Sequence, residues 1–121
     1  MATISKMALS GSTDAVGFTL AIDSGTFTTI HTGPSVAADF DEVWIYGSNI
    51  NTTAETVSIT WGTTSGDTGT MKTVIQANET VLLVPGWVIK GNASTALIIK
   101  GASTTASKVN VVGYVNRIDD A

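Results

Sequence analysis

The segment FDEVWIYGSNI, residues 40–50, decides the fold because it places four large apolar side chains in an unbroken row. A β-strand sends successive side chains to opposite faces of its sheet. Val43 and Ile45 therefore share one face, which can fill the core of a small domain. Trp44 and Tyr46 share the opposite face, which also needs a cover. The segment predicts a strand with two apolar faces.

The rest of the sequence repeats strand-like runs between short polar turns. Apolar or β-branched runs alternate with clusters of Gly, Ser, Asn and Asp, which is typical of a sandwich or barrel. In ETVSITW at 55–61, Val57, Ile59 and Trp61 share one face, which predicts a strand with that face in the core. No segment shows apolar residues at the helical spacing of about 3.6. We predict strands at residues 2–9, 17–22, 26–31, 41–48, 55–61, 71–76, 79–84, 87–90, 95–100 and 107–118.

The length and the composition favour one domain that is stable without covalent links. A chain of 121 residues is long enough to bury a real core, and the absence of cysteine excludes disulfides and thiolate metal sites. We expect an all-β, single-domain antiparallel β-sandwich of jelly-roll-like form. Residues 1–10 are expected to form an extended N-terminal arm or first strand, and residues 11–121 the sandwich domain.

Two loop segments carry separate expectations. The stretch WGTTSGDTGT at 61–70 contains three glycines and is predicted to be the longest loop, projecting from the sandwich. The tripeptide Val84-Pro85-Gly86 predicts a type II turn between two strands, with Pro85 presetting its own φ and Gly86 at positive φ.

The charge pattern argues against a nucleic-acid partner and against a membrane. Only 13% of the residues are charged, the net charge is −4, and the six basic residues are scattered along the chain rather than clustered. The N-terminus lacks the apolar core of a signal peptide, and no apolar run approaches the ~20 residues of a membrane span. We expect a protein that is made in the cytoplasm and binds neither nucleic acid nor membrane.

The titratable residues predict no catalytic, cofactor or metal site. His31 is the only histidine, and without a Gly-x-Ser-x-Gly elbow we interpret it as a structural or surface residue. Asp39, Asp41 and Glu42 crowd together, and calcium ligation by them is the alternative. We expect these carboxylates to be solvated at the start of a strand. The further oxygen ligands considered are Asp23 and Asp67.

Several other strands are apolar on both faces, which indicates a partner surface. VLLV at 81–84, ALII at 96–99 and VV at 111–112 behave like VWIY at 43–46. A two-layer sandwich covers only the inner face of each sheet, so the outer apolar faces imply a second subunit, an intramolecular cover or simple exposure. An exposed aromatic platform for sugars, built from Trp44, Trp61 or Trp87, is a further alternative. The predicted interface residues are Trp44, Tyr46, Trp87, Ile4 and Met7.

Six segments give the chain a resemblance to small structural proteins of tailed bacteriophages. They follow one another over residues 9–118 and consist of packing and turn motifs rather than active-site motifs. The segments are LSGSTDAVGFTLA, FTTIHT, FDEVWIYGSNI, TVSITWG, VIQANETVLLVPG and VNVVGYVNRI.

This resemblance implies a non-enzymatic virion component of the capsid decoration, or cement, type. Such a protein sits on the capsid exterior, commonly as a homotrimer, and stabilises the shell by bridging subunits of the major capsid protein. The partners implied are therefore the major capsid protein and further copies of the chain, with no cofactor. The alternatives are a phage tail, baseplate or fibre component, and a carbohydrate-binding β-sandwich module.

Overall fold

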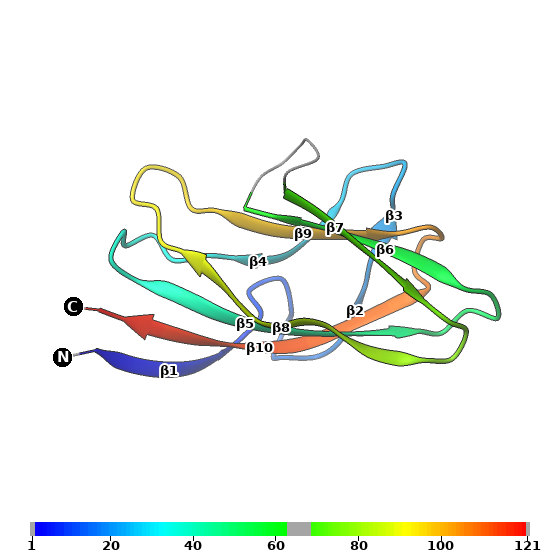
Figure 1. Cartoon of the computed structure of the whole chain (residues 1–121), viewed down its shortest axis with the longest axis horizontal. Helices are drawn as coiled ribbons and strands as arrows, with labels where there is room; N and C mark the ends of the chain where they lie inside the picture. Colours follow the sequence, from blue (N-terminus) through cyan, green and yellow to red (C-terminus); the bar gives the residue numbers. More distant parts are fainter. Residues whose placement is uncertain (1, 63–68, 121) are drawn as a thin grey trace.

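Two β-sheets pack face to face in the computed structural model, which describes residues 2–62 and 69–120 (Figure 1). The described residues contain ten strands and no α-helix. The strands are β1 (Thr3–Ala8), β2 (Phe18–Thr19), β3 (Ala21–Ile22), β4 (Thr28–Thr32), β5 (Phe40–Asn49), β6 (Glu55–Trp61), β7 (Thr70–Ile75), β8 (Thr80–Lys90), β9 (Ile98–Ser103) and β10 (Val109–Asp119).

The strand order is that of a jelly roll. Sheet A has the order β1-β10-β5-β8, with β2 also paired to β10, and sheet B has the order β3-β9-β6-β7, with β4 also paired to β9. From β4 onward the chain changes sheet at every connection except the one between β6 and β7. Such repeated crossing between two sheets is the jelly-roll pattern. The expected all-β sandwich of jelly-roll-like form is confirmed.

One short pair departs from the expected antiparallel arrangement. β3 pairs with β9 in parallel, through Ala21 and Ile22. The chain passes there from sheet A to sheet B without reversing, and Leu20 is fully buried at the crossing. The backbone N–H of Leu20 donates to Val109 and its carbonyl accepts from Ser107, so the crossing closes one side of the sandwich.

The core lies between the sheets and is made by alternate residues of each strand. Val43 and Ile45 are fully buried in it, as their place in VWIY predicts. Complete burial of each such side chain contributes about 1.5–3 kcal/mol relative to exposure. Trp61 packs at the margin of this core, also as predicted. The buried cluster is Leu9, Leu20, Ile30, Val43, Ile45, Val57, Ile59, Ile75, Leu83, Val84, Ile89, Ile99, Val109, Val111 and Val115.

The predicted turn at residues 84–86 is wrong, although Gly86 does have a positive φ, of 76°. The chain does not reverse there, and β8 continues from Thr80 to Lys90 with two irregularities in its register against β5. Pro85 is tolerated because β8 lies at the edge of sheet A, where a missing N–H breaks no ladder. The predicted loop at 61–70 falls largely on residues 63–68, which lie outside the described residues.

Candidate functional site

The outer face of sheet A gathers aromatic and aliphatic side chains from four strands. Directly paired residues of neighbouring antiparallel strands project to the same face, so the register identifies the members of each row. From the β1 side to the β8 side, the rows are Ile4–Ile118–Phe40–Lys90, Lys6–Asn116–Glu42–Val88, Ala8–Tyr114–Trp44–Pro85 and Val112–Tyr46–Leu82. We call this surface the outer face.

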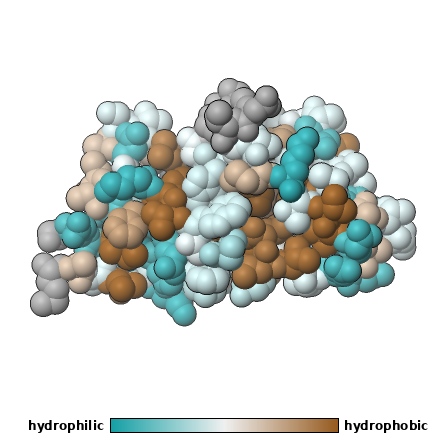
Figure 2. All heavy atoms as spheres, viewed as in Figure 1, coloured by the Kyte–Doolittle hydropathy of each residue, from teal (hydrophilic) through white to brown (hydrophobic). Residues whose placement is uncertain are grey.

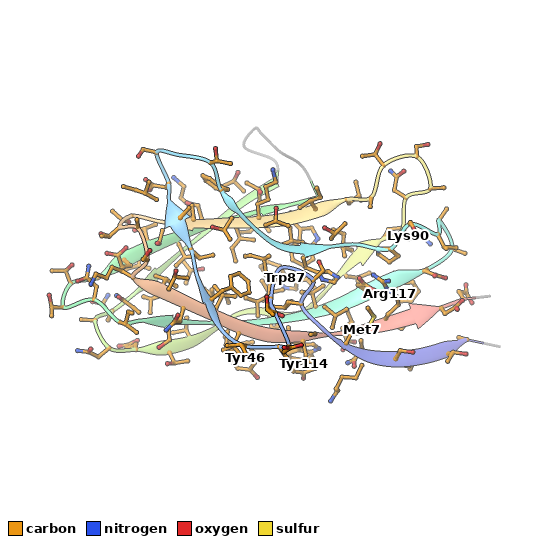
Figure 3. The ribbon with its side chains drawn as sticks, turned by 180° about the vertical axis from the view of Figure 1, so that it is seen from behind. Met7, Tyr46, Trp87, Lys90, Tyr114 and Arg117 are labelled. Atoms are coloured by element: carbon orange, nitrogen blue, oxygen red, sulfur yellow. The ribbon has the colours of Figure 1, made fainter. Side chains whose placement is uncertain are left out.

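Five large apolar side chains of the outer face are exposed to solvent. Ile4 is 69% exposed and Tyr46 is 38% exposed, and both stand on the side of the sheet away from the core. Figure 3 shows Tyr46 and Tyr114 projecting below the sheet, on the side opposite the second layer. The exposed apolar residues of the outer face are Ile4, Tyr46, Leu82, Val88 and Val112.

The centre of the outer face is an ordered aromatic pair. The rings of Trp44 and Tyr114 stack with an interplanar angle of 10° and centroids 6.1 Å apart. The Trp44 indole N–H donates to Glu42 Oε1 at 2.8 Å, and the Asn116 amide donates to the same oxygen at 3.0 Å. These two hydrogen bonds lower the pKa of Glu42, so the carboxylate stays charged. The Nζ of Lys6 lies 4.8 Å from the centroid of the Tyr114 ring.

Sheet B presents a different outer surface. Thr56, Ser58 and Thr60 of β6 face outward beside Lys72 of β7 and Lys100 of β9. Ser58 and Thr60 are nevertheless buried, although their short side chains point to the outer side of sheet B. Val74, on the outward row of β7, is the exposed large apolar residue among the described positions of this face. The two outer surfaces of the sandwich thus differ sharply in hydrophobicity.

Three of the five predicted interface residues lie on the outer face, and two do not. Trp44, Tyr46 and Ile4 belong to it. Met7 pairs with Val115 and packs against the core, because it is one residue out of phase with Ile4 and Lys6. Trp87 pairs with Val43 on the inner side of β8, although 37% of it is exposed at the sheet edge. The partner of these residues stays a prediction.

Sequence reasoning did not single out Leu82, Val88, Val112 and Tyr114. The sequence does point to Leu82 and Val112, because VLLV and VV indicate strands with two apolar faces. The place of Val88 depends on the irregular register of β8, which the sequence pattern does not encode.

Trp87 meets Trp61 in the seam between the sheets. Their rings form an edge-to-face pair, with centroids 5.6 Å apart and an interplanar angle of 80°. The Trp61 indole N–H donates to the carbonyl of Val88 at 3.3 Å. Figure 2, which views the molecule from the side of β7 and β8, shows hydrophobic residues in separate patches along this side. The crossed rings offer no common plane on which a sugar could stack.

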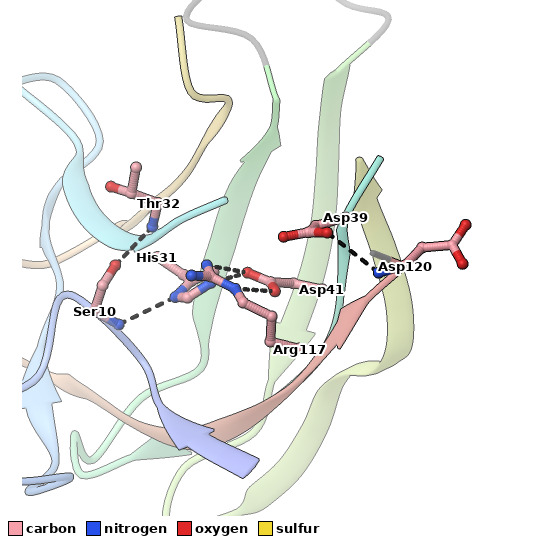
Figure 4. A network of polar contacts seen from close by, with 7 residues as sticks. All are labelled: Ser10, His31, Thr32, Asp39, Asp41, Arg117 and Asp120. Carbon is pink, nitrogen blue, oxygen red and sulfur yellow. Dashed lines mark hydrogen bonds and ion pairs between the residues drawn. The ribbon is translucent and has the colours of Figure 1, made fainter. Parts of the chain in front are cut away.

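A buried polar cluster lies on the inner side of sheet A (Figure 4). The Asp41 carboxylate accepts two hydrogen bonds from Arg117, at 2.8 and 2.9 Å, and one from His31 Nε2, at 2.7 Å. Asp41 and His31 are fully buried, and Asp39 is nearly so. The expectation that these carboxylates are solvated is therefore wrong for Asp39 and Asp41. Strand alternation turns Asp41 inward beside Arg117, whereas Glu42 points outward and is partly exposed.

The cluster is structural in character. His31 Nδ1 accepts the backbone N–H of Ser10 at 3.1 Å, so His31 Nε2 carries the proton donated to Asp41. Burial would raise the pKa of Asp41, but the hydrogen bonds from Arg117 and His31 outweigh it and lower that pKa. The described residues contain no group of three or more His, Asp or Glu side chains arranged to hold a metal ion. No helix within the described residues is long and apolar enough to cross a membrane.

Comparison with known proteins yields a likeness of fold alone. No protein-family model matches the sequence, and none of the curated proteins matches it. A chain from the disulfide-linked pili formed by Bacillus endospore appendages superposes with a TM-score of 0.56 and 13% identity, over 96% of this chain and 86% of that one. A chain of the T13 viral particle of IBDV superposes with a TM-score of 0.52 and 9% identity, over 97% of this chain but only 31% of that one.

Proposed function

We propose that the chain is a non-enzymatic structural protein of a virion, and that it decorates and stabilises an assembled capsid by laying the outer face of sheet A on shell subunits. The observation that carries the proposal is the concentration of five exposed apolar side chains on that face. Protein interfaces have aromatic and aliphatic centres that are poor in charge. Both superposed structures belong to large assemblies, a pilus and a viral particle, which supports a structural role.

The stabilising mechanism is mass action. A protein that binds the assembled shell and not its separate subunits stabilises each site by RT ln(1 + [L]/Kd), which is about 2.7 kcal/mol at a hundredfold excess over Kd. Because many copies bind one shell, even a weak contact at each site can stabilise the whole capsid. The homotrimer implied by the phage resemblance stays a prediction, and so does the location on the capsid exterior.

Cosedimentation of the purified chain with undecorated shells tests the proposal. Tyr46→Ser and Leu82→Ser remove apolar surface of the outer face and leave the buried core cluster intact, so the free energy of unfolding should fall by only about 1 kcal/mol and the fold should persist. Binding should weaken by roughly tenfold or more for each variant. Trp44 is a poorer probe, because its indole is tied to Glu42 and stacked on Tyr114.

Val74→Ser is the matched control, because Val74 is an aliphatic residue on the outer surface of sheet B that is more exposed than Tyr46 and Leu82. It should bind shells like the parent protein. Equal loss in all three variants, or no loss in any, would contradict the assignment of the outer face as the capsid contact.

A subunit of a tail, fibre or surface appendage is the second candidate, and the likeness to a pilus chain favours it. Those pili are disulfide-linked, whereas this chain has no cysteine, so a filament of this chain needs non-covalent links. Electron microscopy of the concentrated protein would show filaments in that case. A carbohydrate-binding module is a weaker alternative, because Lys6 lies over Tyr114 and Trp61 is crossed with Trp87.

A further inference from the structure

The four edges of the two sheets are not equally protected against pairing with another chain. A free strand edge presents unpaired N–H and C=O groups, and natural proteins blunt it with proline, bulges, short strands or lysine. β8 carries Pro85 and two register irregularities. At the corresponding edge of sheet B, β3 has two residues and β4 is irregular between Thr29 and His31. β7 carries the exposed Lys72 at its centre.

β1 carries only one of these devices, the exposed Lys6. It pairs with β10 through six consecutive residues without a register shift, and it contains no proline. Its one charged residue is Lys6, whose ammonium group lies over the Tyr114 ring instead of guarding the edge. In an antiparallel strand, alternate residues direct their N–H and C=O groups away from the paired neighbour. Among the described residues, no strand occupies that side of β1.

We infer that the free edge of β1 pairs in antiparallel fashion with β1 of a second copy of this chain, about a two-fold axis at Ser5. If the outer faces of both copies are to lie on the same side, the two-fold axis must run perpendicular to the joined sheet. Such an axis places one residue of β1 directly opposite the same residue of the second copy. An axis at Lys6 would set two lysines side by side, which is unfavourable. An axis at Ser5 sets Ser5 opposite Ser5, Ile4 opposite Lys6, and Thr3 opposite Met7.

This pairing joins two copies of sheet A into one sheet with the order β8-β5-β10-β1-β1-β10-β5-β8. The two outer faces then form one continuous surface, with the exposed Ile4 residues near its middle. Because a pairing of five residues buries much less than the roughly 1,200 Å² of a stable interface, the dimer should dissociate on dilution. The contact does not depend on the proposed capsid role, and it differs from the threefold contact that the phage resemblance implies.

Cysteine scanning provides a direct test, because the parent chain has no cysteine. Directly opposed Cα atoms in an antiparallel pair lie about 4.5–5.5 Å apart, which suits a disulfide. Ser5→Cys should therefore form a covalent dimer under mild oxidation, and the yield should rise with protein concentration. Thr73→Cys, on the exposed edge strand β7, is the matched control and should cross-link at least about fivefold more slowly.

A charge variant supplies the reversible measurement by sedimentation across a dilution series. Ser5→Glu places Glu beside Arg117 within its own sheet, which favours the fold of β1, but opposes two carboxylates across the two-fold axis. The dimer dissociation constant should rise on the order of fivefold, whereas Thr73→Glu should leave it unchanged.

Three results would overturn the inference: a monomer at every concentration, a trimer, or equal cross-linking rates for the two cysteine variants. None of them bears on shell binding by Tyr46 and Leu82, which is measured separately.

Discussion

Asp41 is the centre of the buried polar contacts that hold the sandwich together. Its carboxylate is fully buried and holds Arg117 from β10 and His31 from β4, so it links the two sheets. Removing one partner of a buried ion pair costs about 3–5 kcal/mol, and the partial exposure of Arg117 places Asp41→Asn near 3 kcal/mol. Urea unfolding measures the loss. Asp23→Asn, at an exposed position, should unfold like the parent protein.

The lowered pKa of Asp41 also predicts a loss of stability in acid. A carboxyl group whose pKa is lower in the folded than in the unfolded chain binds fewer protons when folded. Its contribution is fully present above the unfolded value, near 3.8, and is lost as the pH falls through the lower folded value. Between pH 5 and pH 2 the parent protein should therefore lose more stability than Asp41→Asn does. Parallel curves of unfolding free energy against pH would exclude Asp41 as the titrating group.

At the scale of the element, β8 is shaped by one glycine. Gly86 has a positive φ of 76°, and a Cβ there would lie 2.8 Å from Trp44 Cζ2. Gly62 has a similar φ of 72°, but its nearest neighbours to an added Cβ are 3.8–4.0 Å away. Gly62→Ala should therefore cost about 1 kcal/mol from backbone strain alone. Gly86→Ala should cost more and alter the Trp44 environment.

Thermal unfolding followed by tryptophan fluorescence separates the cost of backbone strain from the cost of the clash with Trp44 in these variants. Equal shifts of Tm for Gly62→Ala and Gly86→Ala, with unchanged emission, would mean that the Trp44 ring does not rest on Gly86. A larger shift for Gly86→Ala would show that the irregular β8 supports the centre of the outer face.

The strands themselves were largely predictable from alternation, because side-chain period and burial are linked in a half-buried sheet. The pattern in ETVSITW predicts β6 at its observed bounds, and VWIY predicts which face of β5 is buried. The joining of 79–84 with 87–90 was not predictable, because Pro-Gly favours a turn locally and only the edge position of β8 accommodates it as a bulge. Strand partners were beyond reach too, since alternation carries no information on register.

The existence of an apolar outer surface was predictable from the sequence, but the full set of residues that form it was not. Two apolar faces on one strand indicate an outer surface that a partner covers. The alternation within β5 is enough to place Trp44 and Tyr46 on that surface. Met7 was misplaced, because the phase of an exposed edge strand such as β1 is not revealed by its own weak alternation. In the His31–Asp41–Arg117 cluster, His31 lies 10 positions and Arg117 76 positions from Asp41, with no common motif, so only the folded register brings them together.

Over the whole molecule, the contrast between the two outer surfaces predicts the thermodynamics of attachment. The outer face of sheet A carries few charges, and Lys6 and Glu42 are already engaged with Tyr114, Trp44 and Asn116. Binding through this face should show a negative heat-capacity change and little dependence on salt, because apolar burial and not ion pairing drives it. Isothermal titration of shells at several temperatures, at 50 and 500 mM salt, measures both quantities.

Lys90→Ala is the control for that experiment, because Lys90 lies at the rim of the same face and donates to the carbonyl of Ala37. It should leave the affinity within about twofold, as expected for a charged residue at an interface rim. A tenfold loss of affinity between the two salt concentrations would show instead that charged side chains hold the partner. Lys6 and Glu42 would carry such a salt dependence if the contact is the outer face of sheet A, and Lys72 and Lys100 would carry it if the contact is the outer surface of sheet B.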